Sequence, residues 1–210
     1  MDGHNWYSYC AGNPINAWDP SGYEKIVVSG GYAGSEGQKQ KFIDSGLTSL
    51  HKMLQQNSDE PITWLIADSG YSWLEKIRIG NLARNLGVNS VFFSSADEFV
   101  DYINTKGTDK ESRLADQISK MEVFAHGGIG VLLFGYQKNT AANVTMEDID
   151  RIDSDAFKVL FLGTWFGACN TGTSVDGGDS FAQKWADKTR GTSLAVYDGK
   201  TNLITLKLTS

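Results

Sequence analysis

Short apolar runs alternate with longer stretches of helical period along most of this chain. The runs at residues 26–29, 62–67, 91–93 and 122–125 each stop at small or polar residues. Between them, apolar residues recur three or four positions apart, as they do in amphipathic helices. Strands that alternate with helices predict an α/β fold, here a three-layer sandwich with a mostly parallel sheet.

The same pattern assigns bounds to the remaining elements. Helices are expected at 37–55, 73–86, 96–103, 110–119, 146–157 and 180–188, the last with Asp179 as its N-cap. Further strands are expected at 130–136, 158–168, 193–197 and 203–208, the first of them paired as a hairpin with the strand at 122–125. Asp198-Gly199-Lys200 is expected to form a turn between the last two strands.

Residue composition and periodicity divide the chain into two parts. Residues 1–24 are dense in Asn, Gly, Pro and aromatic residues and have no helical period, whereas residues 25–210 carry the alternating pattern. With 210 residues and 40% apolar content, the chain is long enough for one sizeable core. We therefore expect a single globular domain at 25–210, preceded by a separate segment at 1–24.

Charge and cysteine content exclude several classes of function. The formal net charge is −6 and no basic stripe is present, which argues against a nucleic-acid partner. No run approaches the roughly 20 apolar residues that cross a bilayer, so no membrane span is expected. Cys10 and Cys169 have no neighbours at metal-ligand or disulfide-framework spacing, and we expect two separate thiols, no metal and no cofactor.

Two strand ends carry the candidate chemistry. His126 opens a glycine turn after the run at 122–125, and Cys169 follows the apolar segment 158–168. In open α/β sheets, loops at the carboxyl ends of strands build the ligand crevice. A thiolate is the nucleophilic form of cysteine and needs a nearby base. The pair predicts Cys169 as nucleophile and His126 as general base, the alternative being a small core thiol and a hydrogen-bonded strand-end histidine.

These motifs resemble the caspase-like, or clan CD, cysteine peptidases, which carry His-Gly after one strand and Ala-Cys after the next. Residues 168–172, Ala-Cys-Asn-Thr-Gly, resemble most closely the CHAT subgroup, and the order of elements matches over about residues 25–208. The resemblance implies a caspase/gingipain-like fold, with the backbone N–H groups of Gly127 and Cys169 binding the oxyanion. The residues flanking Ala168-Cys169 depart from true caspases, so cleavage after aspartate is not implied.

By the same resemblance, substrate selection belongs to the loops at 30–38 and 173–179 and to the turn near Asp198. Asp176, Asp179 and Asp198 are candidates for binding a basic side chain of the substrate. Solvated surface acids are the alternative interpretation of all three. The sequence leaves the substrate residue open.

The amino-terminal segment resembles the end of the RHS-repeat core of polymorphic toxins, including Tc-toxin-like proteins. The resemblance rests on residues 2–9, 12–16 and 19–22. It implies that Asp2 and Asp19 match the self-cleavage aspartates of that core and that residues from Tyr23 onward are a toxic effector. Such an effector is carried by an RHS shell or toxin complex, secreted by the producing bacterium and translocated into the target-cell cytosol, where it would cleave a protein substrate.

Three other functions are alternatives to a peptidase. An ADP-ribosyltransferase is a frequent cargo of such shells, but its Glu-Xaa-Glu signature does not occur here. A Rossmann-like nucleotide binder would use the glycines of residues 30–34, which lack a full Gly-Xaa-Gly-Xaa-Xaa-Gly. The third is a caspase-like module that binds a partner without catalysis.

Overall fold

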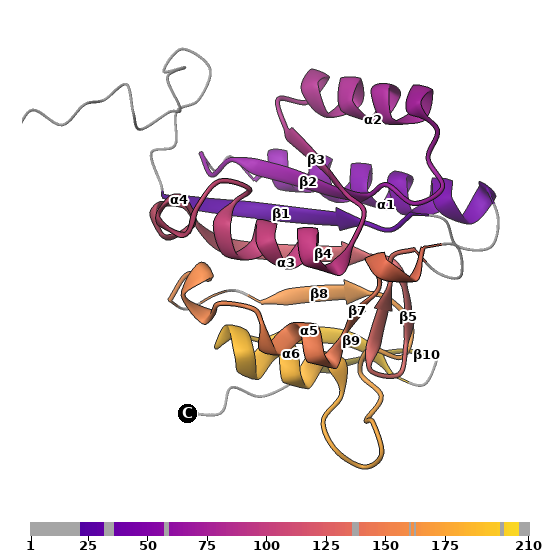
Figure 1. Cartoon of the computed structure of the whole chain (residues 1–210), viewed down its shortest axis with the longest axis vertical. Helices are drawn as coiled ribbons and strands as arrows, with labels where there is room; N and C mark the ends of the chain where they lie inside the picture. Colours follow the sequence, from indigo (N-terminus) through magenta and orange to yellow (C-terminus); the bar gives the residue numbers. More distant parts are fainter. Residues whose placement is uncertain are drawn as a thin grey trace, which may run out of the picture.

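The structure is a computed structural model. It describes residues 22–31, 36–56, 59–135, 139–159, 161, 163–197 and 200–205. For residues 36, 38, 197 and 200–205 it describes the backbone only. Within these residues a seven-stranded sheet is flanked by helices on both faces, and a three-stranded sheet lies at one end (Figure 1). Strands and helices alternate along the chain as predicted. The predicted α/β three-layer sandwich with a mostly parallel sheet is thereby confirmed.

Strand order in the large sheet is β10-β9-β8-β4-β1-β2-β3. Neighbours from β3 to β9 are parallel, and β10 pairs antiparallel with β9. The chain builds outward from β1 to β3 and then returns to place β4 on the other side of β1, which makes β1 and β4 the topological switch point. The strands are β1 (Tyr23–Ser29), β2 (Ile62–Ala67), β3 (Asn89–Phe93), β4 (Gln117–Phe124), β8 (Thr164–Gly167), β9 (Ser193–Tyr197) and β10 (Lys200–Thr205).

The central strands are buried on both faces. Every residue of β2 is buried, as are six of the seven residues of β1. Continuous apolar strands of this kind are typical of parallel sheets covered on both sides, because neither set of alternating side chains faces water. This is why the short apolar runs located these strands well in the sequence.

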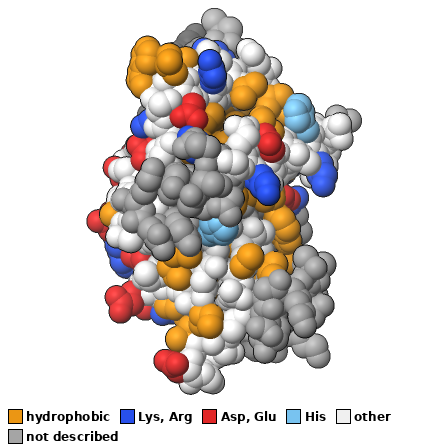
Figure 2. Space-filling model, turned by 90° about the vertical axis from the view of Figure 1, so that its right-hand side faces the viewer, with side chains coloured by type: hydrophobic (Ala, Val, Ile, Leu, Met, Phe, Trp, Pro, Cys, Tyr) orange, Lys and Arg blue, Asp and Glu red, His pale blue; other side chains and the backbone are white. Residues whose placement is uncertain are grey.

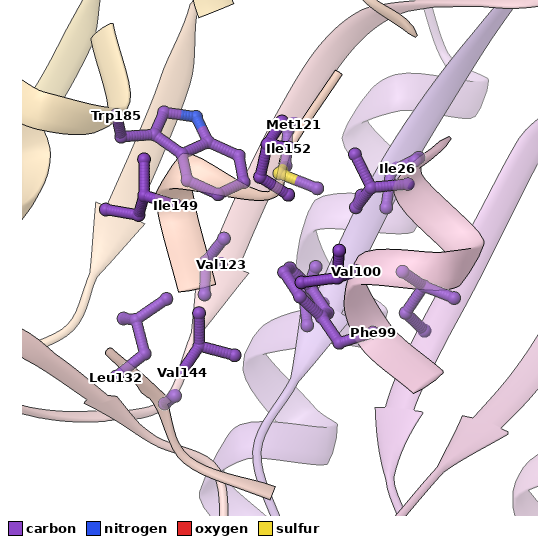
Figure 3. Packing of buried hydrophobic residues seen from close by; sticks show 14 of the residues in the cluster. Ile26, Phe99, Val100, Met121, Val123, Leu132, Val144, Ile149, Ile152 and Trp185 are labelled. Carbon is purple, nitrogen blue, oxygen red and sulfur yellow. The ribbon is translucent and has the colours of Figure 1, made fainter. Parts of the chain in front are cut away.

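Helices form a layer on each face. Leu50 of α1 (Glu36–Leu54) and Ile79 of α2 (Trp73–Asn85) belong to the apolar cluster on one face. The other face is covered by α3 (Ala96–Thr105), α5 (Met146–Asp150) and α6 (Phe181–Thr189), with α4 (Lys110–Ala115) packed beside α3. Figure 3 shows Phe99 of α3 and Trp185 of α6 directed towards β4, where Val123 lies. The candidate residues His126 and Cys169 follow the carboxyl ends of β4 and β8, between these two layers.

Polar side chains mark where the helices begin. Ser72, Ser95, Asp109 and Ser180 each accept a hydrogen bond from the backbone N–H three residues later, which satisfies a donor that the first turn leaves unpaired. At α6 the cap is Ser180, whose Oγ accepts from the N–H of Gln183 at 3.1 Å, and the predicted cap Asp179 is wrong by one residue.

Glu75 completes the capping box of α2. Its carboxylate accepts from the Ser72 N–H at 2.7 Å and pairs with the Lys39 ammonium at 2.9 Å. The hydrogen bond from Lys39, followed by those from Ser72, lowers the pKa of Glu75 to about 2. The start of α2 is thus tied to α1 by an ion pair in which the Lys39 side chain is only 4% exposed.

The predicted hairpin forms with a different partner. Residues 131–133 do not pair with β4; β6 (Val131–Leu133) pairs antiparallel with β5 (His126–Gly128) and with β7 (Val144–Thr145). The chain turns out of the large sheet at Ala125, immediately after β4 ends. The sequence showed two apolar runs around a glycine turn but gave no sign of where the sheet changes.

Two predicted helices are too long. The helix expected at 110–119 ends at Ala115, because residues from Gln117 extend β4 alongside β1. Ile118 and Ser119 are buried there, and the Ser119 hydroxyl donates to the Glu24 carbonyl at 3.2 Å. The helix expected at 146–157 ends at Asp150 and is followed by the 3₁₀ turn Ser154–Ala156; a second 3₁₀ turn spans Thr140–Ala142.

A buried ion pair lies at the amino end of β1. The Arg113 guanidinium donates to Glu24 at 2.7 Å, and both side chains are fully buried. The hydroxyls of Tyr102 and Thr63 also donate to the Glu24 carboxylate, and burial raises the pKa of the Tyr102 phenol well above its usual value. Strands β1 and β2 and helices α3 and α4 are therefore joined by one polar cluster.

Among the described residues, none of the helices combines the length and the apolarity that crossing a membrane requires.

Candidate functional site

Strand pairing brings His126 and Cys169 to neighbouring strand ends. Strands β4 and β8 are parallel, with Phe124 opposite Gly167 at their last paired position. His126 and Cys169 each follow two residues later. Adjacent strands lie about 4.8 Å apart, so the two residues leave the sheet at one place.

Direct backbone contact joins the two turns. A Cβ built on Gly127 would lie 2.1 Å from the Cys169 carbonyl oxygen and 3.1 Å from the carbonyl carbon and Cβ of Ala168. Real Cβ atoms do not approach backbone atoms so closely, and this position therefore requires glycine. The His-Gly turn and the Ala-Cys turn are packed against each other in the fold.

The His126 side chain lies on the face of the sheet that α1 covers. Ala125 and Ala168 are buried in the cluster beneath α3 and α6, and side chains along a strand alternate between faces. The His126 ring meets the Phe42 ring of α1 edge-on, with centroids 5.4 Å apart and planes at 86°. This contact places the imidazole on the α1 face independently of the alternation.

The turn that presents Cys169 is held at several points. The Thr171 hydroxyl donates to the Ala168 carbonyl at 3.0 Å, and the Thr171 carbonyl accepts from the Ala182 N–H at 2.9 Å. The Gly172 N–H donates to the Val196 carbonyl of β9 at 3.1 Å. The Cys169 side chain itself is an exposed free thiol. A tethered turn with an exposed thiol resembles a reactive position more than a core position, where cysteines are usually buried.

Two of the candidate substrate-binding aspartates belong to the loop that follows Cys169. Asp176 and Asp179 are exposed residues of the loop between β8 and α6, and Asp176 has a positive φ of 48°. The tip of this loop reaches the β5–β6 turn, because a Cβ on Gly130 would lie 2.9 Å from Cγ2 of Val175. Asp198, together with Asp2 and Asp19 of the predicted self-cleavage pair, lies outside the described residues.

The phosphate-cradle hypothesis is not supported by the glycines after β1. The Gly30 N–H donates to the Phe124 carbonyl at 2.7 Å, and the Gly31 N–H donates to the Phe134 carbonyl at 3.0 Å. Both amides are therefore used inside the fold. Close packing explains Gly31, because a Cβ there would lie 2.4 Å from the Ser69 carbonyl oxygen. The described part of the predicted nucleotide-binding loop joins β1 to β4 and β2.

A groove next to the predicted pair was missed in the sequence. It has a volume of about 300 Å³ and lies between α1 and strands β4 and β8, with Phe124 and Trp165 on the sheet side. Phe42 of α1, which touches His126, was also missed. Neither feature has a signal in residue spacing, because both depend on α1 packing across strands that are more than 60 residues away in the chain. Strand alternation from His126 back to Phe124 could have indicated the sheet side of the groove.

The face at the carboxyl ends of the strands has mixed charge. Figure 2 looks onto this end and shows acidic and basic side chains interspersed among apolar and uncharged ones. Among the described residues, no three His, Cys, Asp or Glu side chains come together as a metal site. Comparison of the chain with protein-family models, with curated proteins and with solved structures found no match. The chemistry of the site is therefore argued from its own residues.

Proposed function

We propose that this domain is a cysteine endopeptidase that uses Cys169 as nucleophile and His126 as general base. The observation that carries the proposal is the packing of the His126-Gly127 turn against the Ala168-Cys169 backbone at the ends of paired strands. A residue type that can act as a nucleophile and one that can act as a base thus follow the ends of two paired strands. The caspase-like resemblance of the two motifs adds support.

Acylation begins with transfer of the thiol proton from Cys169 to the imidazole of His126. The thiolate then attacks the substrate carbonyl carbon, forming a C–S bond and leaving a negative charge on the oxygen. Backbone N–H groups of Gly127 and Cys169 are the proposed donors to this oxyanion; one such donor contributes about 3–4 kcal/mol in a known enzyme. Collapse of the intermediate breaks the C–N bond as His126 returns its proton to the leaving amine.

Deacylation reuses the same base. A water molecule loses a proton to His126 and attacks the thioester carbon, and the C–S bond breaks to release the carboxylic acid. The imidazolium then reprotonates the thiolate. One water molecule is consumed for each peptide bond cleaved, and the enzyme returns to its starting state.

The biological setting proposed for this activity is that of a toxin effector. It rests on the resemblance of residues 1–24 to the end of an RHS core, which implies a carrier shell and delivery into the cytosol of a target cell. A cytosolic protein would then be the substrate. The alternative is a caspase-like module that binds a partner without catalysis, and covalent labelling of Cys169 distinguishes it from a peptidase.

The test is covalent labelling of the purified chain with a peptide chloromethyl ketone, read by mass spectrometry of the intact chain and its fragments. Labelling is expected at Cys169, to be abolished in Cys169→Ala and slowed at least tenfold in His126→Ala. Cys10→Ala is the matched thiol control and is expected to label like the parent. Equal labelling at Cys10, or cleavage of substrate by Cys169→Ala, would overturn the proposal.

In target cells, the same variants test the setting. Expression of residues 22–210 is expected to be toxic, and Cys169→Ala and His126→Ala are each expected to remove the toxicity at equal protein level. New peptide termini mapped in exposed cells would identify the substrate. Unchanged toxicity in both variants would contradict a peptidase mechanism for the effector.

A further inference from the structure

Among the described residues, the helices on the α1 face pack against only one half of the sheet. Helix α1 packs against β1, β2 and β4, whereas the helix packed on β9 is α6, from the opposite face. In Figure 1, α1 lies behind the half of the sheet that contains β1 and β2, and α5 and α6 lie in front of the half that contains β8 and β9. Trp165 of β8 and Leu194 of β9 accordingly remain partly exposed.

The groove described above runs along the edge of α1 where this half of the sheet ends. Its α1 wall is formed by Ser45, Thr48, Ser49 and Lys52. Its floor on the sheet is formed by Glu122 and by the rings of Phe124 and Trp165, which pack edge to face with centroids 5.0 Å apart. An aromatic floor beside a short polar wall favours a ligand with one large apolar group.

The floor is continuous with the predicted catalytic pair. Phe124 precedes His126 by two residues, and Gly167 lies between Trp165 and Cys169 at the same spacing on β8. Two residues of a strand span about 7 Å and return to the same face. The groove is thus lined by residues of the two strands whose carboxyl ends lead to His126 and Cys169, and Phe124 is its lining residue nearest in sequence to His126.

Charge at the groove is mostly compensated within the fold. Glu122 accepts from the Ser49 hydroxyl at 2.7 Å and pairs with Lys120 at 2.8 Å. Lys52, at the end of the groove away from His126, is exposed and takes part in no ion pair among the described residues. A basic ligand group is disfavoured at that end, and an uncharged apolar group is the best match to the floor.

We infer that this groove is a substrate subsite that selects a peptide with a bulky apolar side chain, such as Phe or Leu, close to the cleaved bond. This inference rests on the proposed peptidase function and adds its substrate class. A volume of about 300 Å³ suits one large side chain, since sites for small ligands begin at roughly that volume.

The experiment uses internally quenched peptides that differ at a single position, carrying Phe, Leu, Ala or Lys at successive places around the bond. The expected result is one position at which kcat/KM for Phe or Leu exceeds that for Ala and for Lys by at least about tenfold, the discrimination a hydrophobic pocket gives. Thr48 is exposed on the rim, so Thr48→Trp is expected to fill the groove and remove this preference.

Matched variants separate blocking from misfolding. His51→Trp adds the same ring on an exposed position of α1 outside the groove and is expected to keep the Phe and Leu preference. Trp165→Ala removes half of the floor and is expected to lower kcat/KM for the Phe peptide more than for the Ala peptide. The circular dichroism spectrum and urea midpoint of Thr48→Trp should match those of His51→Trp, which shows that the blocked variant is folded.

Failure of the inference and failure of the proposed function give different results. If the parent labels at Cys169 and cleaves peptides without an apolar preference, or if Thr48→Trp keeps the preference, the subsite is refuted while the peptidase stands. If the parent neither labels at Cys169 nor cleaves any peptide, both are refuted together.

Discussion

Gly127 and Cys169 are in contact so close that a single methyl group on Gly127 would overlap the Cys169 carbonyl oxygen, at 2.1 Å. Residues 42 positions apart in the chain are thereby fixed against each other at the carboxyl ends of two central strands. The contact depends on strands β4 and β8 being adjacent and parallel. It gives the proposed dyad a structural requirement that can be tested without knowing the substrate.

Gly127→Ala is expected to destabilise the fold by about 2 kcal/mol or more, because added volume in a packed contact forces the backbone to move. Labelling of Cys169 is expected to slow at least tenfold. Urea unfolding measures the first effect and mass spectrometry the second. Gly37→Ala is the control: its Cβ would meet no atom within 4 Å, and alanine in α1 is expected to be neutral or stabilising.

Removal of one partner of the buried pair Glu24–Arg113 is expected to cost about 3–5 kcal/mol, because the other charge is left buried and uncompensated. Arg113→Met tests this in urea unfolding. Arg151→Ala, which removes an arginine with a 48% exposed side chain, is the matched control and is expected to cost less than about 1 kcal/mol. A similar loss in the two variants would show that the buried pair has no special weight.

The capping carboxylate of Glu75 is expected to make α2 sensitive to acid. Its pKa in the fold is lowered from 4.5 to about 2, so its contribution to stability is complete above about pH 4.5 and is lost as the pH falls towards 2. Because the side chain is partly exposed, the contribution is about 1 kcal/mol or less. The stability difference between the parent and Glu75→Gln should shrink between pH 5 and pH 3; a constant difference would contradict the assignment.

Asp176 and Asp179 are expected to behave as surface acids. Both are exposed, and neither forms an ion pair among the described residues. Asp176→Asn and Asp179→Asn should each leave kcat/KM for peptides with Lys near the bond within about twofold of the parent. A fall of tenfold or more in either variant would restore the prediction that these carboxylates bind a basic side chain.

The core of the fold could be predicted because strands that are buried on both faces appear in the sequence as continuous apolar runs. All six residues of β2 are buried, and they form a run that ends at Asp68. The amino end of β4 was missed for the opposite reason. Around the buried Ile118 it carries Gln117, Ser119 and Lys120. Gln117 and Lys120 pair in register with residues of β1, and the Ser119 hydroxyl donates to the Glu24 carbonyl. Polar residues that bond across a sheet look like helix or loop when only the sequence is known.

The candidate pair was predictable for a related reason. His126 and Cys169 each follow an apolar strand and precede glycine-containing turns, and parallel strands bring such ends together. The groove was not predictable, because its wall is on α1 and its floor is on β4 and β8. The width of the groove depends on how α1 packs across the sheet. Adjacent strand ends can thus be inferred from periodicity, whereas cavities between layers need the coordinates.

The position of Glu24 limits how far the chain can be trimmed from its amino end. Excision of the leader up to Gly22 leaves Glu24 in place to neutralise Arg113, whereas a chain that starts at Lys25, the predicted start of the domain, would bury Arg113 without its partner carboxylate. The shortest stable form of the domain therefore includes Glu24, and a chain that starts at Lys25 should unfold at a lower urea concentration than one that starts at Gly22.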